Sequence, residues 1–88
     1  MIHWTDYMKY RAKLHGFDLG NLEEIINYSP ERYLDIETGR LVVVGRHVDD
    51  LVMIPDEQAD QTVTPVTVHV TTRQQINFRL QMERFINA

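Results

Sequence analysis

Alternating apolar and polar residues mark one segment of this chain more clearly than any other. Valines occupy every second position from Val66 to Val70, with Thr67, His69 and Thr71 at the positions between and after them. Side chains along a strand point alternately to the two faces of a sheet. The pattern therefore predicts a strand that carries its valines on one face and His69 on the other.

A helix is predicted to begin directly after this strand. Thr72 and Gln75 have the spacing of a capping box, in which the threonine hydroxyl accepts a hydrogen bond from a free backbone N–H of the first turn. Arg73 then lies in the first turn of the helix. Ile76 and Leu80 follow at the spacing of one helical face, so we expect them to point toward the core, with Phe78 and Met82 as further candidates.

Two more helices are predicted in the first third of the chain. Thr5 is suited to cap the first, and Gly16 suits the left-handed position that follows its end. Asp18 is suited to cap the second, and Pro30 ends it because the residue before a proline is disfavoured in a helix. The buried stripe of the second helix is expected to contain Leu19, Leu22, Ile25 and Ile26.

Between these helices and the last one, the pattern changes to that of strands. Four strands are expected, at residues 33–37, 41–47, 51–54 and 63–71. Pro55 should end the third strand, because proline has no N–H to donate to a ladder. The polar and acidic residues 56–61 should form a loop. Short connections make the first three strands an antiparallel meander.

These elements predict a single α+β domain over residues 1–88, with two N-terminal helices, a four-stranded mainly antiparallel sheet and a C-terminal helix. We expect the helices to cover one face of the sheet. On that covered face the sequence places Leu34, Ile36, Val42, Val44, Val52 or Met53, Val66, Val68 and Val70, packed against the second and third helices.

Composition narrows the class of protein. The chain has no cysteine, which excludes disulfides and thiolate chemistry, and its longest apolar run, residues 41–44, is too short to span a bilayer. The start of the chain lacks the pattern of a signal peptide, so we expect a cytoplasmic protein. A net charge of −4 disfavours general nucleic-acid binding, although clustering of the acidic residues leaves room for a local basic face.

Several short motifs resemble those of a known group of proteins. They are Arg11-x-x-x-His15-Gly16, Pro30-Glu31-Arg32-Tyr33, Gly39-Arg40 and His69-x-Thr71-Thr72-Arg73-Gln74. With this order of elements, the chain resembles a family of small bacterial proteins of unknown function. That family is in turn similar to the BrnT branch of the RelE/ParE toxin superfamily. The resemblance extends from about Met8 to Leu80, and the chain departs from the toxin pattern in being acidic overall.

The resemblance implies a toxin-like endoribonuclease within a toxin–antitoxin pair, with RNA as substrate and an antitoxin-like protein as partner. RNA cleavage without a metal needs a general base, a general acid and cations that hold the charge of the phosphorane. His69 and Arg73 are the candidate catalytic residues, because the predicted strand and helix place an imidazole, a guanidinium and a helix N-terminus near one another. Arg46 and Arg11 are candidate contacts for the RNA.

Structural explanations exist for each of these residues. A histidine on the polar face of a strand is more often a sheet residue than a catalyst, and Arg73 has acidic residues to pair with. In strand 41–47, only one of Arg46 and His47 can point to an open face unless Gly45 forms a bulge. The four histidines lack the spacing of a metal site, so we expect neither a metal nor another cofactor.

Two classes of function therefore remain. The first is a toxin-like RNA-cleaving enzyme that acts on the sheet face left open by the helices. The second is a non-catalytic domain of the same fold that binds a protein partner through that face or through a sheet edge.

Overall fold

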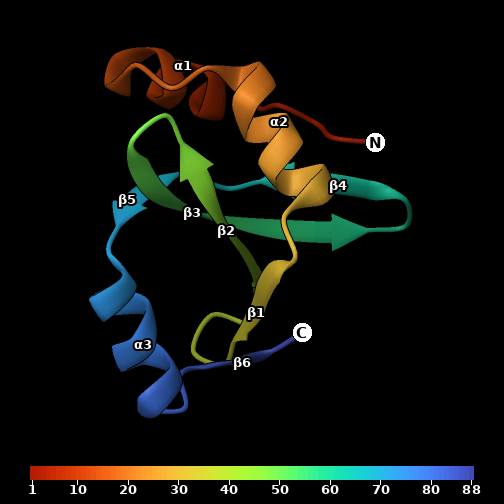
Figure 1. Cartoon of the computed structure of the whole chain (residues 1–88). Coiled ribbons are helices and arrows are strands. Elements are labelled where there is room, and N and C mark those ends of the chain that lie inside the picture. The colour runs from red at the N-terminus through yellow and green to blue at the C-terminus, as the bar shows by residue number, and fades with distance from the viewer.

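The computed structural model describes all residues from Met1 to Ala88 and contains three helices and six strands (Figure 1). The helices are α1 (Asp6–His15), α2 (Leu19–Tyr28) and α3 (Arg73–Gln81). The strands are β1 (Glu31–Asp35), β2 (Leu41–His47), β3 (Asp50–Ala59), β4 (Thr62–Pro65), β5 (His69–Thr71) and β6 (Phe85–Asn87). None of the helices is long and apolar enough to cross a membrane.

The predicted helix ends are confirmed. The Thr5 side chain accepts a hydrogen bond from Met8 N at 3.1 Å, and Gly16 follows α1 with a φ of 73°. Asp18 caps α2 through a bond from Gly20 N, also at 3.1 Å. Local side chains therefore fix where both helices begin, as the sequence indicates.

The predicted four-stranded sheet is wrong. The sheet has six antiparallel strands in the order β4-β3-β2-β1-β6, and β5 pairs with the same edge of β3 as β4 does. The strand expected to stop at Pro55 continues to Ala59, and residues 56–59, predicted as a loop, pair with β4. The sixth strand, Phe85–Asn87, pairs with β1 beyond α3 and was not expected.

Pro55 explains why the predicted strand 63–71 is split in two. The carbonyl of Pro55 points to the β4 and β5 side of β3, since it accepts a bond from Val66 N at 2.8 Å. The missing N–H of Pro55 faces the same side, where a ladder partner would find no donor. Residues 66–68 leave the ladder at this point, and pairing resumes at His69 opposite Met53.

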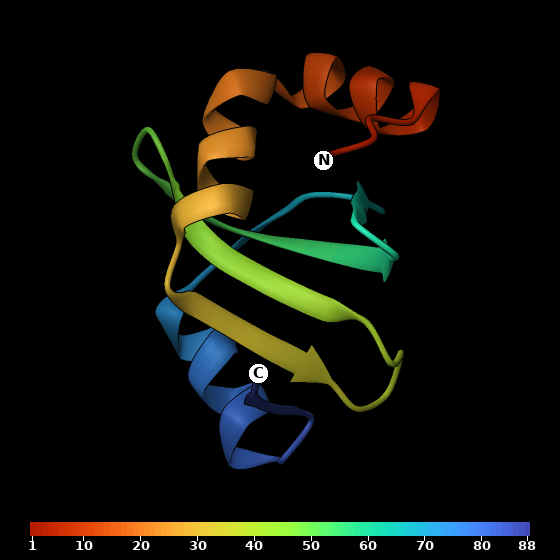
Figure 2. The ribbon, with the colours of Figure 1, turned by 90° about the vertical axis from the view of Figure 1, so that its right-hand side faces the viewer.

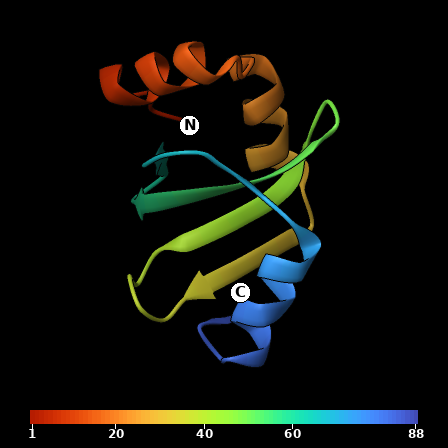
Figure 3. The ribbon, with the colours of Figure 1, turned by 90° about the vertical axis from the view of Figure 1, so that its left-hand side faces the viewer.

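The helices cover both faces of the sheet, and the prediction that they cover one face is wrong. α1 and α2 lie on one side of the strands and α3 on the other, as Figures 2 and 3 show. Val43 packs in the core cluster of α2, whereas its neighbours Val42 and Val44 pack in the cluster of α3. Consecutive valines are all buried because the central strand is covered on both sides.

Two residues that we expected in the core, Ile36 and Val70, are exposed, and so are the further candidates Phe78 and Met82. Ile36 and Val70 each keep 55% of their surface accessible. Ile36 lies just beyond the end of β1, and Val70 lies on the short β5, which no strand flanks on its outer side. Val68, in contrast, is fully buried under α1 and α2.

Candidate functional site

His69 contacts α1 from its position on β5. Arg11 Nη2 lies 3.3 Å from His69 Nδ1, and Arg11 Nε donates to the carbonyl of Val68 at 3.1 Å. A guanidinium has only donors, so Nδ1 must accept this bond with its lone pair. The proton of the neutral imidazole then lies on Nε2, which leaves Nε2 as the nitrogen that can contact a ligand.

The surroundings of His69 also favour its neutral form. Burial lowers the pKa of His69, and the nearby charges of Arg11 and Arg79 lower it further. All three causes disfavour a second proton on the ring. His69 is therefore neutral at pH 7, in the tautomer that Arg11 selects.

Arg73 does not contact His69. Its guanidinium makes two bonds to the carboxylate of Glu31 on β1, of which the Nη2–Oε1 bond is 3.0 Å long. The same carboxylate accepts a bond from the Tyr33 hydroxyl at 2.6 Å. Burial and this bond to Glu31 raise the pKa of Tyr33 to about 12. Arg73 thus anchors the start of α3 to β1, and the structure does not bring the two candidate catalytic residues into contact.

The structure separates the roles of Arg46 and His47. His47 is buried, and its Nε2 accepts a hydrogen bond from Asp18 N at 2.9 Å, next to the ring of Phe17. Arg46 is exposed at the end of β2 and donates to the carbonyl of Asp49 within the turn. His47 therefore supports the start of α2, and Arg46 points to solvent. The two neighbours point to opposite faces of the strand, as the alternation of side chains predicted.

A pocket of about 190 Å³ lies between the sheet and α3, and His69 lines it together with three arginines, Arg40, Arg79 and Arg84. Arg40 makes an ion pair with Glu57 at 3.1 Å. Arg84 makes two bonds of 3.2 Å to the carboxylate of Asp35, which also lines the pocket. Two of the three guanidinium groups are thus already neutralised by carboxylates.

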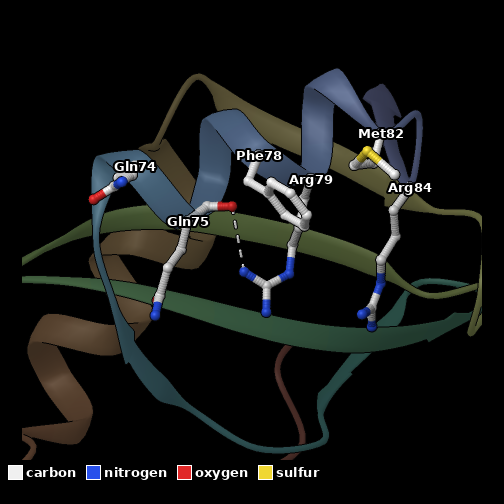
Figure 4. A pocket seen from close by; sticks show the side chains of 6 residues that line it. All are labelled: Gln74, Gln75, Phe78, Arg79, Met82 and Arg84. Carbon is white, nitrogen blue, oxygen red and sulfur yellow. Dashed lines mark hydrogen bonds between the residues drawn. The ribbon is translucent and has the colours of Figure 1, made fainter.

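Arg79 is the cation of this pocket that has no carboxylate partner. Its guanidinium donates to the carbonyl of Gln75 at 3.4 Å and stands over the ring of Phe85, 5.7 Å from the ring centroid. Arg79 also lines an adjoining groove of about 420 Å³ along α3. Figure 4 shows Arg79 and Arg84 extending side by side from α3 and the following turn toward the sheet, beside Phe78 and Met82. Arg79 is therefore the side chain best placed to meet an added anion.

Sequence reasoning missed Arg40, Arg79 and Arg84 as residues near His69. A charge pattern carried part of this information, because residues 66–88 contain three arginines and one carboxylate in a chain that is acidic overall. The fold of α3 over the sheet supplies the rest. No group of three or more histidine, aspartate or glutamate side chains is placed to hold a metal ion.

Comparison with protein-family models, with curated proteins and with solved structures finds no match for this chain. The resemblance to BrnT-type toxins therefore stays a prediction from the motifs.

Proposed function

We propose that this chain binds single-stranded RNA along the groove of α3 as a toxin-like endoribonuclease. The observation that supports RNA binding is the pair of Phe78 and Arg79 at one groove. Phe78 is 60% exposed, and its neighbour Arg79 has no carboxylate partner. Proteins that bind single strands combine an aromatic surface for a base with a cation for the adjacent phosphate.

The charges around the groove limit how many phosphates the chain can contact. Arg40, Arg73 and Arg84 are each held by a carboxylate, which leaves Arg79 as the free cation on this side. We therefore expect one or two phosphate contacts rather than a long track along the backbone. A contact count of this size gives a shallow salt dependence, with a logarithmic slope of about −0.7 for each phosphate on a single strand.

Cleavage depends on His69. In the tautomer that the Arg11 contact implies, Nε2 carries a proton and can donate it in a hydrogen bond to a phosphate oxygen, but it cannot accept the proton of a 2′-hydroxyl. Nδ1 accepts a proton only after Arg11 releases it. In the proposed reaction, a bound phosphate attracts the Arg11 guanidinium away from His69, and Nδ1 then takes the proton of the 2′-hydroxyl. The 2′-oxygen attacks the adjacent phosphorus and the bond to the 5′-oxygen breaks. The 5′-oxygen leaves with a proton from water, which gives a 2′,3′-cyclic phosphate and a 5′-hydroxyl end.

The test is a titration of a labelled single-stranded oligoribonucleotide, followed by fluorescence anisotropy. We expect Arg79→Gln to weaken binding by about tenfold, which corresponds to the loss of one charge-assisted contact. Phe78→Ala should weaken it by a similar factor through lost stacking. Lys9→Gln removes the same charge from an exposed position on α1 and should leave binding unchanged. Gel analysis of the same RNA should show cleavage that His69→Asn abolishes while binding persists.

A second function is favoured by the apolar residues of the groove. Phe78 on α3 and Met82 just after its end, 64% exposed, both line this groove, as expected of a surface that binds a protein partner. If folded wild-type protein does not bind RNA, or if Lys9→Gln weakens binding as much as Arg79→Gln does, the RNA proposal fails. The groove is then better explained as the partner surface of a non-catalytic domain.

A further inference from the structure

Asp56 lies within a row of residues that crosses the whole sheet. The strand register places Asp56 opposite Pro65 on one side and Leu41 on the other. Leu34 lies opposite both Leu41 and Ile86. Residues directly opposite one another in neighbouring strands point to the same face. These five side chains therefore share one face of the sheet.

This is the face covered by α1 and α2, but the helices stop short of the row. Asp56 points to the same face of the sheet as Ile54, two residues earlier on β3. Ile54 is fully buried in the core cluster beneath those helices. Leu34, Leu41 and Ile86 belong to neither core cluster, and Ile86 is 42% exposed. The row is thus an apolar strip at the margin of the helices, with a carboxyl group between Pro65 and Leu41.

One oxygen of the Asp56 carboxyl group lacks a hydrogen-bond partner. Asp56 is 1% exposed, and its Oδ1 is buried with no hydrogen bond to any atom of the chain. The nearby cation, Arg32, is engaged elsewhere, because it donates to the carbonyls of Ser29 and Ile26 at the end of α2. A buried carboxyl oxygen without a donor is rare, since nearly all buried polar atoms in proteins are hydrogen-bonded.

Asp56 lines a pocket of about 230 Å³ together with the apolar residues Leu41, Val42, Val43 and Ala88, with Gln58, and with Arg32, whose guanidinium is already bound to the two carbonyls at the end of α2. Gln58 is exposed and also lines a second hollow on its other side. Its side chain lies beside the carboxyl of Asp56. The exposed Gln58 side chain therefore lies at the rim of this pocket, beside the Asp56 carboxyl group.

We propose that this pocket binds a basic side chain of a partner polypeptide, with its guanidinium or ammonium group on Asp56 Oδ1 and its flanking apolar residues on Leu34, Leu41 and Ile86. This surface lies on the opposite face of the sheet from the groove of α3. It is independent of the proposed RNA binding.

The chemistry of the pocket favours a cation on an apolar stem. The aliphatic walls suit the methylene groups of arginine or lysine, whose charged ends stay available for a carboxylate. A metal ion is disfavoured because no group of three or more histidine, aspartate or glutamate side chains is placed to hold one. Burial raises the pKa of the Asp56 carboxyl group, and a bound cation lowers this pKa because it favours the charged carboxylate.

Three probes test the proposal by NMR chemical-shift mapping. The peptide acetyl-Leu-Arg-Leu-amide should shift the amide resonances of Leu41, Asp56 and Gln58 in a saturable way. Butylguanidinium should shift the same resonances with weaker affinity, because it lacks the flanking leucines. N-butylurea has nearly the same shape without the charge and should shift none of them. The peptide should also lower the pKa of Asp56, read from its carboxyl carbon.

Two variants complete the test. Asp56→Asn keeps the shape of the side chain and should abolish the shifts, whereas Gln58→Ala removes a side chain at the rim and should keep or strengthen them. Equal binding of butylurea and butylguanidinium, or unchanged binding by Asp56→Asn, overturns the cation site. Peptide binding no tighter than that of butylguanidinium overturns the partner surface. If Asp56→Asn does not fold, the three probes still test the proposal on the wild-type protein. They also test it on Gln58→Ala, which changes only an exposed residue.

Discussion

Arg11 selects the tautomer of His69. The Nη2 group of Arg11 lies 3.3 Å from His69 Nδ1, and 58 residues of chain separate the two. Because arginine only donates, the imidazole must accept at Nδ1 and carry its proton on Nε2. The contact also fastens α1 to β5, since the same arginine holds the carbonyl of Val68.

Substitution of Arg11 should change how His69 titrates. Burial is the main cause that lowers the pKa of His69, and the charge of Arg11 is the next. Arg11→Gln removes that charge, so we expect the pKa of His69 to rise toward its ordinary value while staying below it. The measurement is an NMR titration of the His69 ring resonances in both proteins. An unchanged pKa contradicts the electrostatic role of Arg11.

The lowered pKa of His69 also predicts how this residue changes the stability of the fold with pH. A histidine with a lowered pKa binds fewer protons in the folded than in the unfolded chain between the two pKa values. The free energy of unfolding therefore falls as the pH drops from the unfolded value, about 6.5, through the folded value. In His69→Gln this part of the pH dependence should be absent.

The ion pair of Arg73 and Glu31 should stabilise the fold only slightly. The pair is partly exposed, and surface pairs of this kind contribute about 0–1 kcal/mol. The hydrogen bonds from Arg73 lower the pKa of Glu31 despite its partial burial. The stabilisation is then present above the unfolded pKa of Glu31 and is lost as the pH falls through the folded pKa.

Denaturant unfolding of Arg73→Gln checks this prediction. The variant should lose less than about 1 kcal/mol at neutral pH, and the loss should vanish in acid, where Glu31 is protonated in both proteins. A loss of several kcal/mol would show instead that Arg73 carries a larger structural role at the start of α3.

Local signals were sufficient to predict the helices and β2. Thr5, Asp18 and Thr72 each cap a helix with their own side chain, and such contacts span only a few residues. Long-range pairing was not predictable in the same way. The three residues of β6 have no strong strand pattern of their own, and they form a strand because β1 offers a free edge beside them.

The candidate site was predicted in part. The alternation of side chains along the strand correctly placed His69 on the face opposite the buried Val68. The expected contact with Arg73 is absent because Glu31, 42 residues earlier in the chain, attracts that guanidinium. Arg79 comes near His69 only because α3 folds back over the sheet. The sequence contains these charges, but only the tertiary fold determines which of them meet.

The cap of α3 is open to direct measurement. Thr72 Oγ1 accepts a bond from Gln75 N at 3.1 Å, whereas the Gln75 side chain accepts from Thr71 rather than returning to Thr72. Only one half of the predicted capping box is therefore formed. Thr72→Ala should cost about 1 kcal/mol, and Thr72→Asp should be tolerated because aspartate also caps helices. Equal losses in thermal unfolding for the two variants would indicate another role for the hydroxyl.

Ile25 of α2 packs directly over Gly45 of β2. A Cβ atom added at Gly45 would lie 2.6 Å from Ile25 Cγ2 and 2.9 Å from its Cγ1. Isoleucine is branched at Cβ and has little freedom to turn away, so the helix itself must move. We expect Gly45→Ala to lower the free energy of unfolding by about 1–3 kcal/mol.

A compensating substitution distinguishes crowding from other causes. Ile25→Ala clears the space in front of position 45, at the cost of a cavity in the wild-type background. In the double variant, the methyl group added at position 45 fills part of that cavity. The double variant should therefore lose less stability than the two single variants together, by about 0.5–3 kcal/mol in a double-mutant cycle. Strictly additive losses would mean that Gly45 is needed for its backbone and not for the space it leaves to Ile25.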